Sequence, residues 1–154
     1  MQIEIEYAHP RHQGIVDLLS QHHALMQSLF PAEANHYLVV DELCQPDIHF
    51  IGARVDGVYR ACGAIRLNDT YSEVKSMFTD PRARGLGLAD SILSSLTQIT
   101  KNNGRSLMRL ETGVGLDAAH RLYHRHDFQP RGPFGDYRNS DYSLFMEKSI
   151  PQSI

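Results

Sequence analysis

The sequence has no long hydrophobic run, few cysteines and no excess of basic residues. No apolar stretch approaches the roughly 20 residues that span a bilayer. The first residues alternate apolar and acidic side chains, and they lack the basic start and apolar block of a signal peptide. A net charge of −3 disfavours a general nucleic-acid binder, which carries a basic stripe. We therefore expect a cytoplasmic protein that binds neither a membrane nor nucleic acid.

The two cysteines are Cys44 and Cys62. They are able to form a disulfide, but a chain without an export signal more often keeps its thiols reduced. We expect two reduced, buried thiols and assign Cys62 no chemistry.

What the chain does contain is enough apolar material for one core. It has 154 residues, of which 42% are hydrophobic, so residues 1–154 are expected to form a single domain. Periodicity of two or 3.6 residues then predicts the elements. Strands are expected at 3–5, 49–55, 58–67, 72–79, 106–112, 129–131 and 142–147, with helices at about 11–29, 85–102 and 117–125.

Two local signals predict how these elements connect. Asp56-Gly57 lies between two strand patterns, which is a strong hairpin signal. The strand 72–79, the helix 85–102 and the strand 106–112 form a right-handed crossover, so those two strands should run parallel. Residues 31–47 remain ambiguous between a short helix and irregular structure. The expected fold class is α/β (α+β) with a mixed sheet.

The most informative segment is a glycine turn, Arg82-Ala-Arg-Gly-Leu-Gly87, between a strand and a helix. This arrangement leaves free backbone N–H groups at a helix start, where a phosphate group binds. The turn is not a dinucleotide fingerprint, because Asp90 stands where a third glycine is needed, and no Gly-Lys-Ser/Thr follows for a Walker A loop.

The sequence pattern Arg-x-x-Gly-x-Gly after a strand resembles the pyrophosphate loop of the GNAT superfamily of acyl-CoA N-acyltransferases. The hairpin strands, the strand-turn-helix, the following strand and the helix carrying Leu122-Tyr123 before Phe128 come in the order of that fold. The C-terminal segments also resemble a bacterial branch of small, mostly uncharacterised members. The resemblance implies a mostly antiparallel sheet with a central splayed parallel pair, flanked by about four helices.

Two positions depart from the family pattern. Asp127 replaces the usual glycine before the aromatic residue, and aspartate tolerates the left-handed conformation expected there. Many members carry an asparagine near the start of the helix that follows strand 106–112, and Gly115-Leu116-Asp117 offers none. We expect Asp117 to cap this helix, at 117–125.

The resemblance implies acetyl-CoA as co-substrate, with no metal. The N–H groups of residues 84–88 would point at its pyrophosphate, and the arginines would add positive charge. The pantetheine arm would lie against strand 72–79, where an N–H of Met77 or Phe78 is a candidate oxyanion donor. The expected cofactor-binding residues are Met77, Phe78, Thr79, Arg82, Arg84, Gly85, Leu86, Gly87, Leu88 and Ala89.

Three residues are catalytic candidates. The resemblance makes Tyr123 the general acid, because a tyrosine hydroxyl can protonate the departing thiolate. Glu73 on the cofactor strand and Glu111 on the parallel strand are candidate bases. Each of them can instead be a solvated strand residue or an ion-pair partner of Arg109 or Lys75, and a mechanism without a dedicated base is also compatible with the chemistry.

The nine histidines do not indicate a metal site. His120 and His124 share a helix face without an HExxH pattern, and Arg121 crowds them, so we interpret this face as solvated. We interpret His22-His23 as helix surface too. His9 and His36, and the loop with Phe134, Tyr137 and Arg138, are weaker candidates for bordering an acceptor pocket.

The first functional hypothesis is an N-acetyltransferase that acts on an amine of a small molecule or protein by direct attack in a ternary complex. The second is a catalytically silent regulatory domain that binds CoA or acyl-CoA. The third is a binder of another nucleotide phosphate on the same strand-turn-helix. A homodimer is compatible with the sequence.

Overall fold

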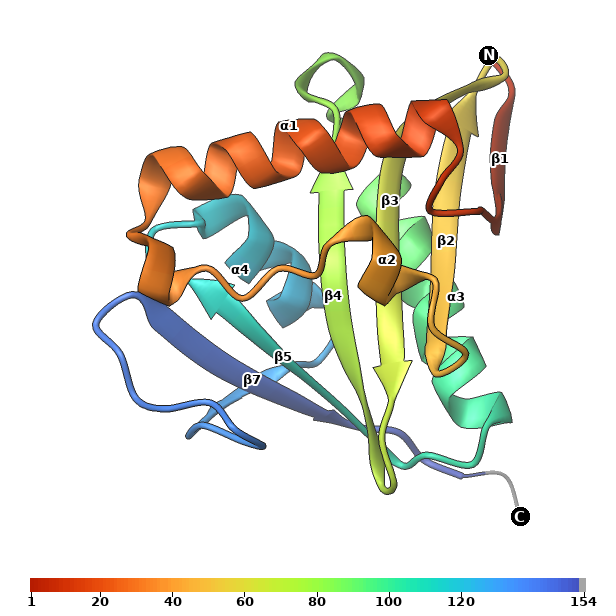
Figure 1. Ribbon diagram of the computed structural model, residues 1–154. Helices are drawn as coiled ribbons and strands as arrows, with labels where there is room; N and C mark the ends of the chain where they lie inside the picture. The colour runs from red at the N-terminus through yellow and green to blue at the C-terminus, as the bar shows by residue number, and fades with distance from the viewer. Residues whose placement is uncertain (153–154) are drawn as a thin grey trace.

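A seven-stranded sheet runs through the computed structural model, which describes residues 1–152 (Figure 1). The strand order across the sheet is β1-β2-β3-β4-β5-β7-β6, and only β4 and β5 pair in parallel. The predicted mixed, mostly antiparallel sheet is therefore confirmed. The strands are β1 (Ile3–Tyr7), β2 (Ile48–Val55), β3 (Val58–Leu67), β4 (Tyr71–Thr79), β5 (Leu107–Gly113), β6 (Gln129–Arg131) and β7 (Ser143–Ser149).

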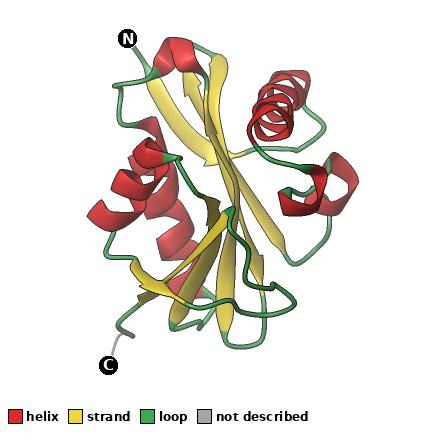
Figure 2. Ribbon diagram, turned by 90° about the vertical axis from the view of Figure 1, so that its left-hand side faces the viewer, coloured by secondary structure: helices red, strands yellow, loops and turns green. Residues whose placement is uncertain are grey.

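Helices cover both faces of the sheet (Figure 2). The long helix α1 crosses one face with the short α2, and α3 lies on the other face (Figure 1). No helix within residues 1–152 combines the length and apolar character needed to cross a membrane. The α-helices are α1 (Gln13–Leu29), α2 (Val40–Leu43), α3 (Leu88–Asn102) and α4 (Asp117–Arg125), and short 3₁₀ turns occupy Ala32–Ala34 and Pro81–Ala83.

The predicted hairpin is present. Asp56 and Gly57 both have positive φ angles, 49° and 85°, as a tight two-residue turn between twisted strands requires. Strands β2 and β3 pair antiparallel on either side, and β4 adds to β3 in the same sense. These three strands form the expected meander.

The parallel pair separates soon after it begins. Strand β4 pairs with β5 only at Tyr71–Glu73, opposite Leu107–Arg109. Strand β5 instead pairs with β7 along its whole length, so its outer half follows β7 away from β4. Figure 1 shows the two strands diverging toward α1 and α4. The splay that the resemblance implied is confirmed.

A bulge distorts β4 at the level of the splay. Cys62 pairs with Phe78 and Ala64 pairs with Lys75, so β4 contains one residue more than β3 between these two pairs. Ser76 lies in the bulge with a φ of 58°, a conformation that residues other than glycine rarely adopt. The bulge bends the strand where it borders the gap.

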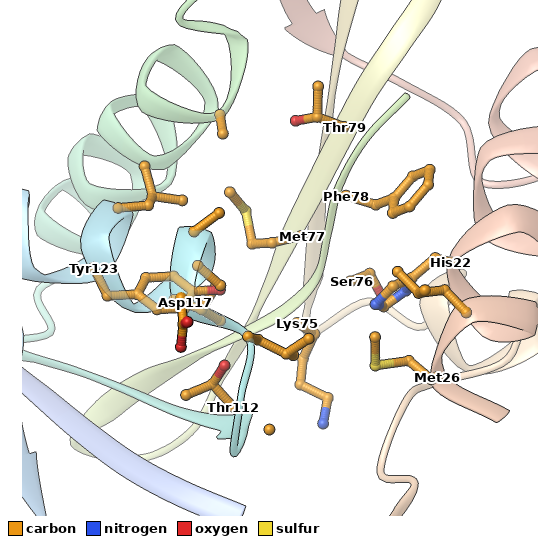
Figure 3. A pocket seen from close by; sticks show the side chains of 18 of the residues that line it. His22, Met26, Lys75, Ser76, Met77, Phe78, Thr79, Thr112, Asp117 and Tyr123 are labelled. Atoms are coloured by element: carbon orange, nitrogen blue, oxygen red, sulfur yellow. The ribbon is translucent and has the colours of Figure 1, made fainter. Parts of the chain in front are cut away.

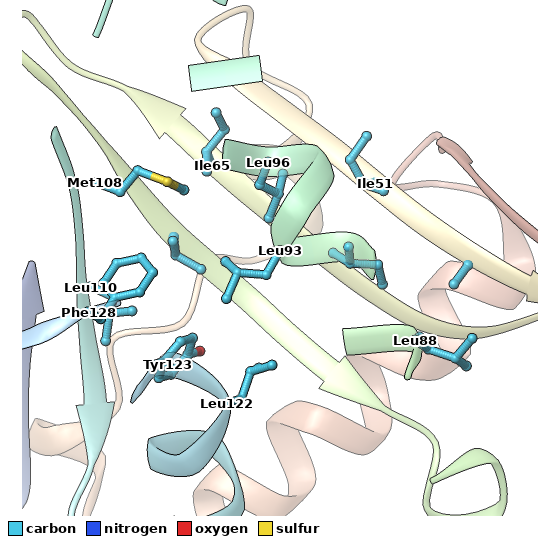
Figure 4. Packing of buried hydrophobic residues seen from close by; sticks show 14 of the residues in the cluster. Ile51, Ile65, Leu88, Leu93, Leu96, Met108, Leu110, Leu122, Tyr123 and Phe128 are labelled. Carbon is cyan, nitrogen blue, oxygen red and sulfur yellow. The ribbon is translucent and has the colours of Figure 1, made fainter. Parts of the chain in front are cut away.

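Two apolar clusters fill the two sides of the sheet. The cluster beneath α3 includes Leu93, Leu96 and Met108, all fully buried (Figure 4). A second cluster joins α1, through Ile15 and Leu18, to β2 and β3. Met77 packs against the first cluster and Phe78 against the second, so neighbouring side chains of β4 point to opposite faces.

Helix ends differ in part from expectation. Helix α3 begins at Leu88 rather than near residue 85, because Gly85 and Gly87 adopt left-handed conformations that no helix continues through. Asp117 does not cap α4: Leu116 occupies the cap position and Asp117 lies in the first turn. The predicted left-handed conformation of Asp127 is confirmed, with a φ of 68°.

Candidate active site

A cleft of about 830 Å³ occupies the gap between β4 and β5 (Figure 3). Residues of α1 and of the segment after it line one side, and residues of α4 and of the start of α3 line the other. Because α1 and α3 lie on opposite faces of the sheet, the cleft connects the two faces through the splayed strands. Two molecules can therefore meet inside it from opposite sides.

The segment that leads into the glycine turn is held by a buried carboxylate. Asp80 is 2% exposed, and its Oδ1 accepts a hydrogen bond from the backbone N–H of Arg82 at 3.0 Å. The side chains of Arg82 and Arg60 donate to the same carboxylate at 2.9 and 3.1 Å. Mainly because of Arg82, the pKa of Asp80 is lowered to about 2. The Arg82 guanidinium is thus engaged by the protein itself.

The glycine turn is open toward the cleft. Gly85 and Gly87 have φ angles of 82° and 73°, and a Cβ added at either position would meet no atom within 4 Å. Gly87 is the N-cap of α3, and no side chain caps its first N–H groups. An anionic group fits there, because these N–H groups and the helix dipole both favour negative charge. Leu86 points the other way and packs against the core.

The free edge of β4 forms one wall of the cleft. Beyond Glu73 this strand has no pairing with β5, and Met77, Phe78 and Thr79 line the opening. Their backbone groups on this edge are available to an extended ligand, which can take the place of a neighbouring strand.

Tyr123 reaches the cleft from α4 (Figure 3). Its ring is 6% exposed and packs edge-on against Phe128 at a centroid distance of 5.7 Å. Burial raises the pKa of Tyr123 well above its ordinary value, and the charge of Glu111 raises it further. The hydroxyl group therefore stays protonated at neutral pH and is able to donate a proton or a hydrogen bond.

The two candidate bases occupy different environments. Glu111 lines the cleft, and burial raises the pKa of its carboxyl group. Glu73 is 7% exposed and does not line the cleft. Its carboxylate accepts a hydrogen bond from the Tyr137 hydroxyl and lies 3.5 Å from the Lys75 ammonium.

Lys75 links two loops on the α1 side of the cleft. Its ammonium donates to the backbone oxygen of His36 at 2.8 Å and to the Tyr137 hydroxyl at 3.0 Å, in addition to its ion pair with Glu73. His36 belongs to the segment after α1, and Tyr137 to the loop between β6 and β7. This network of Lys75, Glu73, Tyr137 and His36 connects both loops to β4.

The structure brings most of the predicted site residues to one cleft, and three of them lie outside its lining. Arg82, Leu86 and Glu73 do not line it, for the reasons given above. Of the weaker candidates, His36 borders the opening, whereas His9, Phe134, Tyr137 and Arg138 do not. The candidates that line the cleft are Met77, Phe78, Thr79, Arg84, Gly85, Gly87, Leu88, Ala89, Glu111 and Tyr123.

Sequence reasoning missed residues that only the folded chain brings to this place. The interpretation of His22 as helix surface was wrong: it lines the cleft and packs on Phe78, with ring centroids 5.6 Å apart. His22 falls on the apolar stripe of α1, and this spacing was the available signal. Arg121 and Arg125 of α4 also border the opening. Arg125 is paired there with the Asp90 carboxylate of α3 at 3.1 Å.

The cysteines and histidines form no further centre. Both cysteines are free thiols; Cys62 is buried as expected, but Cys44 is exposed, contrary to expectation. Within residues 1–152, no group of three or more His, Cys, Asp or Glu side chains is arranged to hold a metal ion.

Known proteins resemble this chain in sequence. The model of the acetyltransferase (GNAT) family matches residues 17–128. A curated protein of Azospirillum brasilense named IAA acetyltransferase is 38% identical over 143 residues, which cover 92% of this chain and 94% of that protein. The uncharacterized N-acetyltransferase YedL of Escherichia coli K12 is 32% identical over 142 residues, which cover 90% and 89%.

Solved structures share the fold. A Klebsiella pneumoniae protein described as a candidate acyl-CoA N-acyltransferase superimposes with a TM-score of 0.82 at 27% identity, over 97% of this chain and 98% of that one. The PaiA N-acetyltransferase of Thermoplasma acidophilum, solved with coenzyme A, gives a TM-score of 0.74 at 15% identity, over 97% and 100%. The family match, which covers most of the chain, and the curated relatives confirm the predicted enzyme class: the chain belongs to the GNAT family of N-acetyltransferases.

Proposed function

We propose that this enzyme transfers an acetyl group from acetyl-CoA to an amine by direct attack in a ternary complex. The observation that carries the proposal is the cleft through the splayed sheet, which has the open glycine turn at one end and the Tyr123 side chain within it. Acetyl-CoA, when bound, supplies an acetyl thioester whose carbonyl carbon an amine nitrogen attacks.

The donor half of the cleft would be built by α3, α4 and β4. The N–H groups from Arg84 to Leu88 would hold the pyrophosphate, with Arg84 and Arg121 adding charge. The free edge of β4 at Met77–Thr79 would hold the pantetheine arm. Arg82 would act indirectly, because its guanidinium binds Asp80 and so positions the start of the turn.

Tyr123 would supply the proton for the leaving thiolate. Its hydroxyl group is protonated at neutral pH, as is that of any tyrosine with an ordinary pKa of about 10, and burial raises this pKa further. A thiol has an ordinary pKa of about 8.5, so a tyrosine hydroxyl is suited to hydrogen-bond to the departing thiolate and to stabilise it.

Glu111 is the better placed of the two candidate bases, because its side chain lines the cleft and burial shifts the pKa of its carboxyl group upward, toward the neutral pH at which a base works best. Direct loss of the amine proton to water is the alternative. Glu73 would be a positioning residue, since its carboxylate is engaged by Tyr137 and Lys75 outside the cleft.

A thiol-release assay over a panel of amines tests the proposal, with acetyl-CoA binding measured in parallel by calorimetry. Acetyl-CoA binding together with amine-dependent release of CoA would support it. Tight binding without release on any amine would instead indicate the silent regulatory domain. Tight binding of ATP or NAD without binding of acetyl-CoA would contradict both.

We also infer that residues 1–154 form a single domain, because one sheet takes in strands from Ile3 to Ser149. A cytoplasmic location is supported by the two free thiols, which are typical of a reducing compartment. A homodimer stays a prediction, and sedimentation equilibrium tests it.

A further inference from the structure

The C-terminal end of α1 reaches across the cleft to the end of β5 (Figure 1). Phe30 is the C-cap of α1, and its half-buried ring lies over Gly113, the last residue of β5. A Cβ added at Gly113 would overlap the Cζ of this ring and would lie only 2.8 Å from its Cε2. The ring therefore occupies the space that a side chain at position 113 would fill.

The backbone of Phe30 is held on both sides. Its N–H donates to the oxygen of Met26 at 3.0 Å, and its own oxygen accepts from the Asn35 amide at 3.5 Å. Pro31 follows, and a residue before proline is restricted to extended conformations, as the φ of −132° and ψ of 149° at Phe30 show. The side chain thus projects from a fixed point, and its contact with β5 depends on the ring.

Glu111 lies on the same face of β5 as Gly113. Successive residues of a strand point to opposite faces, so residues two apart share one. Leu110 packs in the cluster beneath α3, whereas the Phe30 ring comes to Gly113 from the α1 side. Glu111 therefore faces the α1 side, and the Phe30 ring lies two strand residues, or about 7 Å, further along β5.

A second hollow of about 370 Å³ adjoins the cleft at this point. Its lining consists of Gln27, Phe30, Ala32, Asn35 and Tyr37. Three of these residues, Phe30, Asn35 and Tyr37, also line the cleft, so they form the wall between the two hollows. Phe30 is the member of this wall whose side chain contacts Gly113.

We propose that Phe30 sets the length of the acceptor site: an amine placed at Glu111 has room for a body of about 7 Å along β5 before it meets the Phe30 ring. This inference rests on the proposed function and specifies the size of its acceptor. A linear chain covers this length in about six bonds, since an extended peptide chain advances about 3.5 Å over three bonds.

Linear alkylamines test this limit in the thiol-release assay, because Leu25, Met26 and Phe78 line the cleft with apolar atoms. Each methylene group that an apolar site buries raises affinity about fourfold, so a site without a limit would favour the longer amine. We expect kcat/KM for butylamine to exceed that for octylamine by about tenfold in the parent protein, since the longer chain has to displace the ring. Phe30→Ala should reverse this order.

Phe30→Leu keeps an apolar side chain without the ring, so it should shift the ratio in the same direction and guards against a Phe30→Ala protein that does not fold. Leu29→Ala is the matched control, because Leu29 precedes Phe30 on α1 but lines neither hollow. It should keep the ratio of the parent. Calorimetry should show unchanged acetyl-CoA affinity in all three variants.

The outcomes separate the two proposals. The same ratio in the parent and in the folded Phe30 variants would overturn the length limit and leave the acetyltransferase proposal standing, as would a preference of the parent for octylamine. No release of CoA by the parent on any amine of the full panel would overturn both.

A double-mutant cycle tests the position of the ring without any amine. Gly113→Ala should lower the midpoint of thermal unfolding by a few degrees in the parent, because the new Cβ overlaps the ring. The same substitution in the Phe30→Ala protein should lower it by less than half as much. An equal fall in both proteins would mean that the ring does not rest on Gly113 and would overturn the inference.

Discussion

At the scale of single residues, the backbone conformation of the glycine turn and the open space around it determine which residues fit there. Gly85 and Gly87 have positive φ angles and empty surroundings, so a side chain at either position would be strained and would project into open space. Gly104, at the other end of α3, has a similar φ of 75° and is equally unobstructed. Substitutions at Gly87 and at Gly104 therefore separate the effect of backbone strain from the effect of lost cofactor binding.

Gly87→Glu should abolish acetyl-CoA binding, because its carboxylate would occupy the place proposed for the pyrophosphate. Gly104→Glu introduces comparable strain, about 1–2 kcal/mol for a left-handed residue with a Cβ, far from the cleft. Isothermal calorimetry should show lost affinity in the first variant and unchanged affinity in the second. Equal affinities in the two variants would refute the loop assignment.

Tyr123→Phe should lower turnover more than acetyl-CoA affinity. The variant keeps the ring packed on Phe128 but removes the proton donor, and a positioned general acid contributes about 10²–10⁴-fold in rate. Steady-state kinetics with calorimetry separates the two effects. Equal kcat values for the variant and the parent would remove Tyr123 from the mechanism.

At the scale of elements, β4 determines the site by its irregularities. Its early separation from β5 opens the cleft, the bulge at Ser76 bends its edge, and Asp80 at its end ties the strand to the glycine turn. Each feature lies within a few residues of the next, so the strand connects the edge proposed for the pantetheine arm to the proposed pyrophosphate loop.

Asp80→Asn should loosen this connection and change how stability depends on pH. The folded pKa of Asp80 lies below its unfolded value, so its contribution to stability is present above about pH 4 and is lost as the pH falls toward 2. The midpoint of thermal unfolding, measured between pH 5 and pH 2, should therefore fall less steeply with decreasing pH in the variant than in the parent protein. The same pH dependence of the midpoint in both proteins would mean that the charge of Asp80 does not stabilise the fold.

The sequence predicts elements better than their irregularities. A local signal located the Asp56-Gly57 hairpin, since that turn depends on the backbone preferences of its two residues, whereas the left-handed conformation of Asp127 was expected from the family resemblance. The bulge at Ser76 has no such signal. The splay arises because β5 pairs with the distant β7 along its whole length, which no local pattern records.

At the scale of the whole molecule, the cleft joins the two faces of the sheet, and loops distant in sequence surround its α1 side. The network of Lys75, Glu73, Tyr137 and His36 holds these loops, with partners up to 64 residues apart. The same distance explains why the sequence did not show that His22 lines the cleft and that Glu73 lies outside it: periodicity places a residue on a helix or strand face, but the opposing segment decides whether that face lines a cleft.

Glu73→Gln distinguishes a positioning residue from a base. We expect a raised acceptor KM and a loss of about 1–3 kcal/mol in the free energy of unfolding, since Lys75 and Tyr137 lose a charged partner. The shape of the profile of kcat/KM against pH should not change. A hundredfold fall in kcat with loss of the acid limb would instead make Glu73 the base.

A crystal structure with acetyl-CoA bound tests the central claim most directly. The account predicts the pyrophosphate on the N–H groups from Arg84 to Leu88, the pantetheine arm along the free edge of β4, and the thioester sulfur facing the Tyr123 hydroxyl. A pyrophosphate bound elsewhere, with the glycine turn empty, would contradict it.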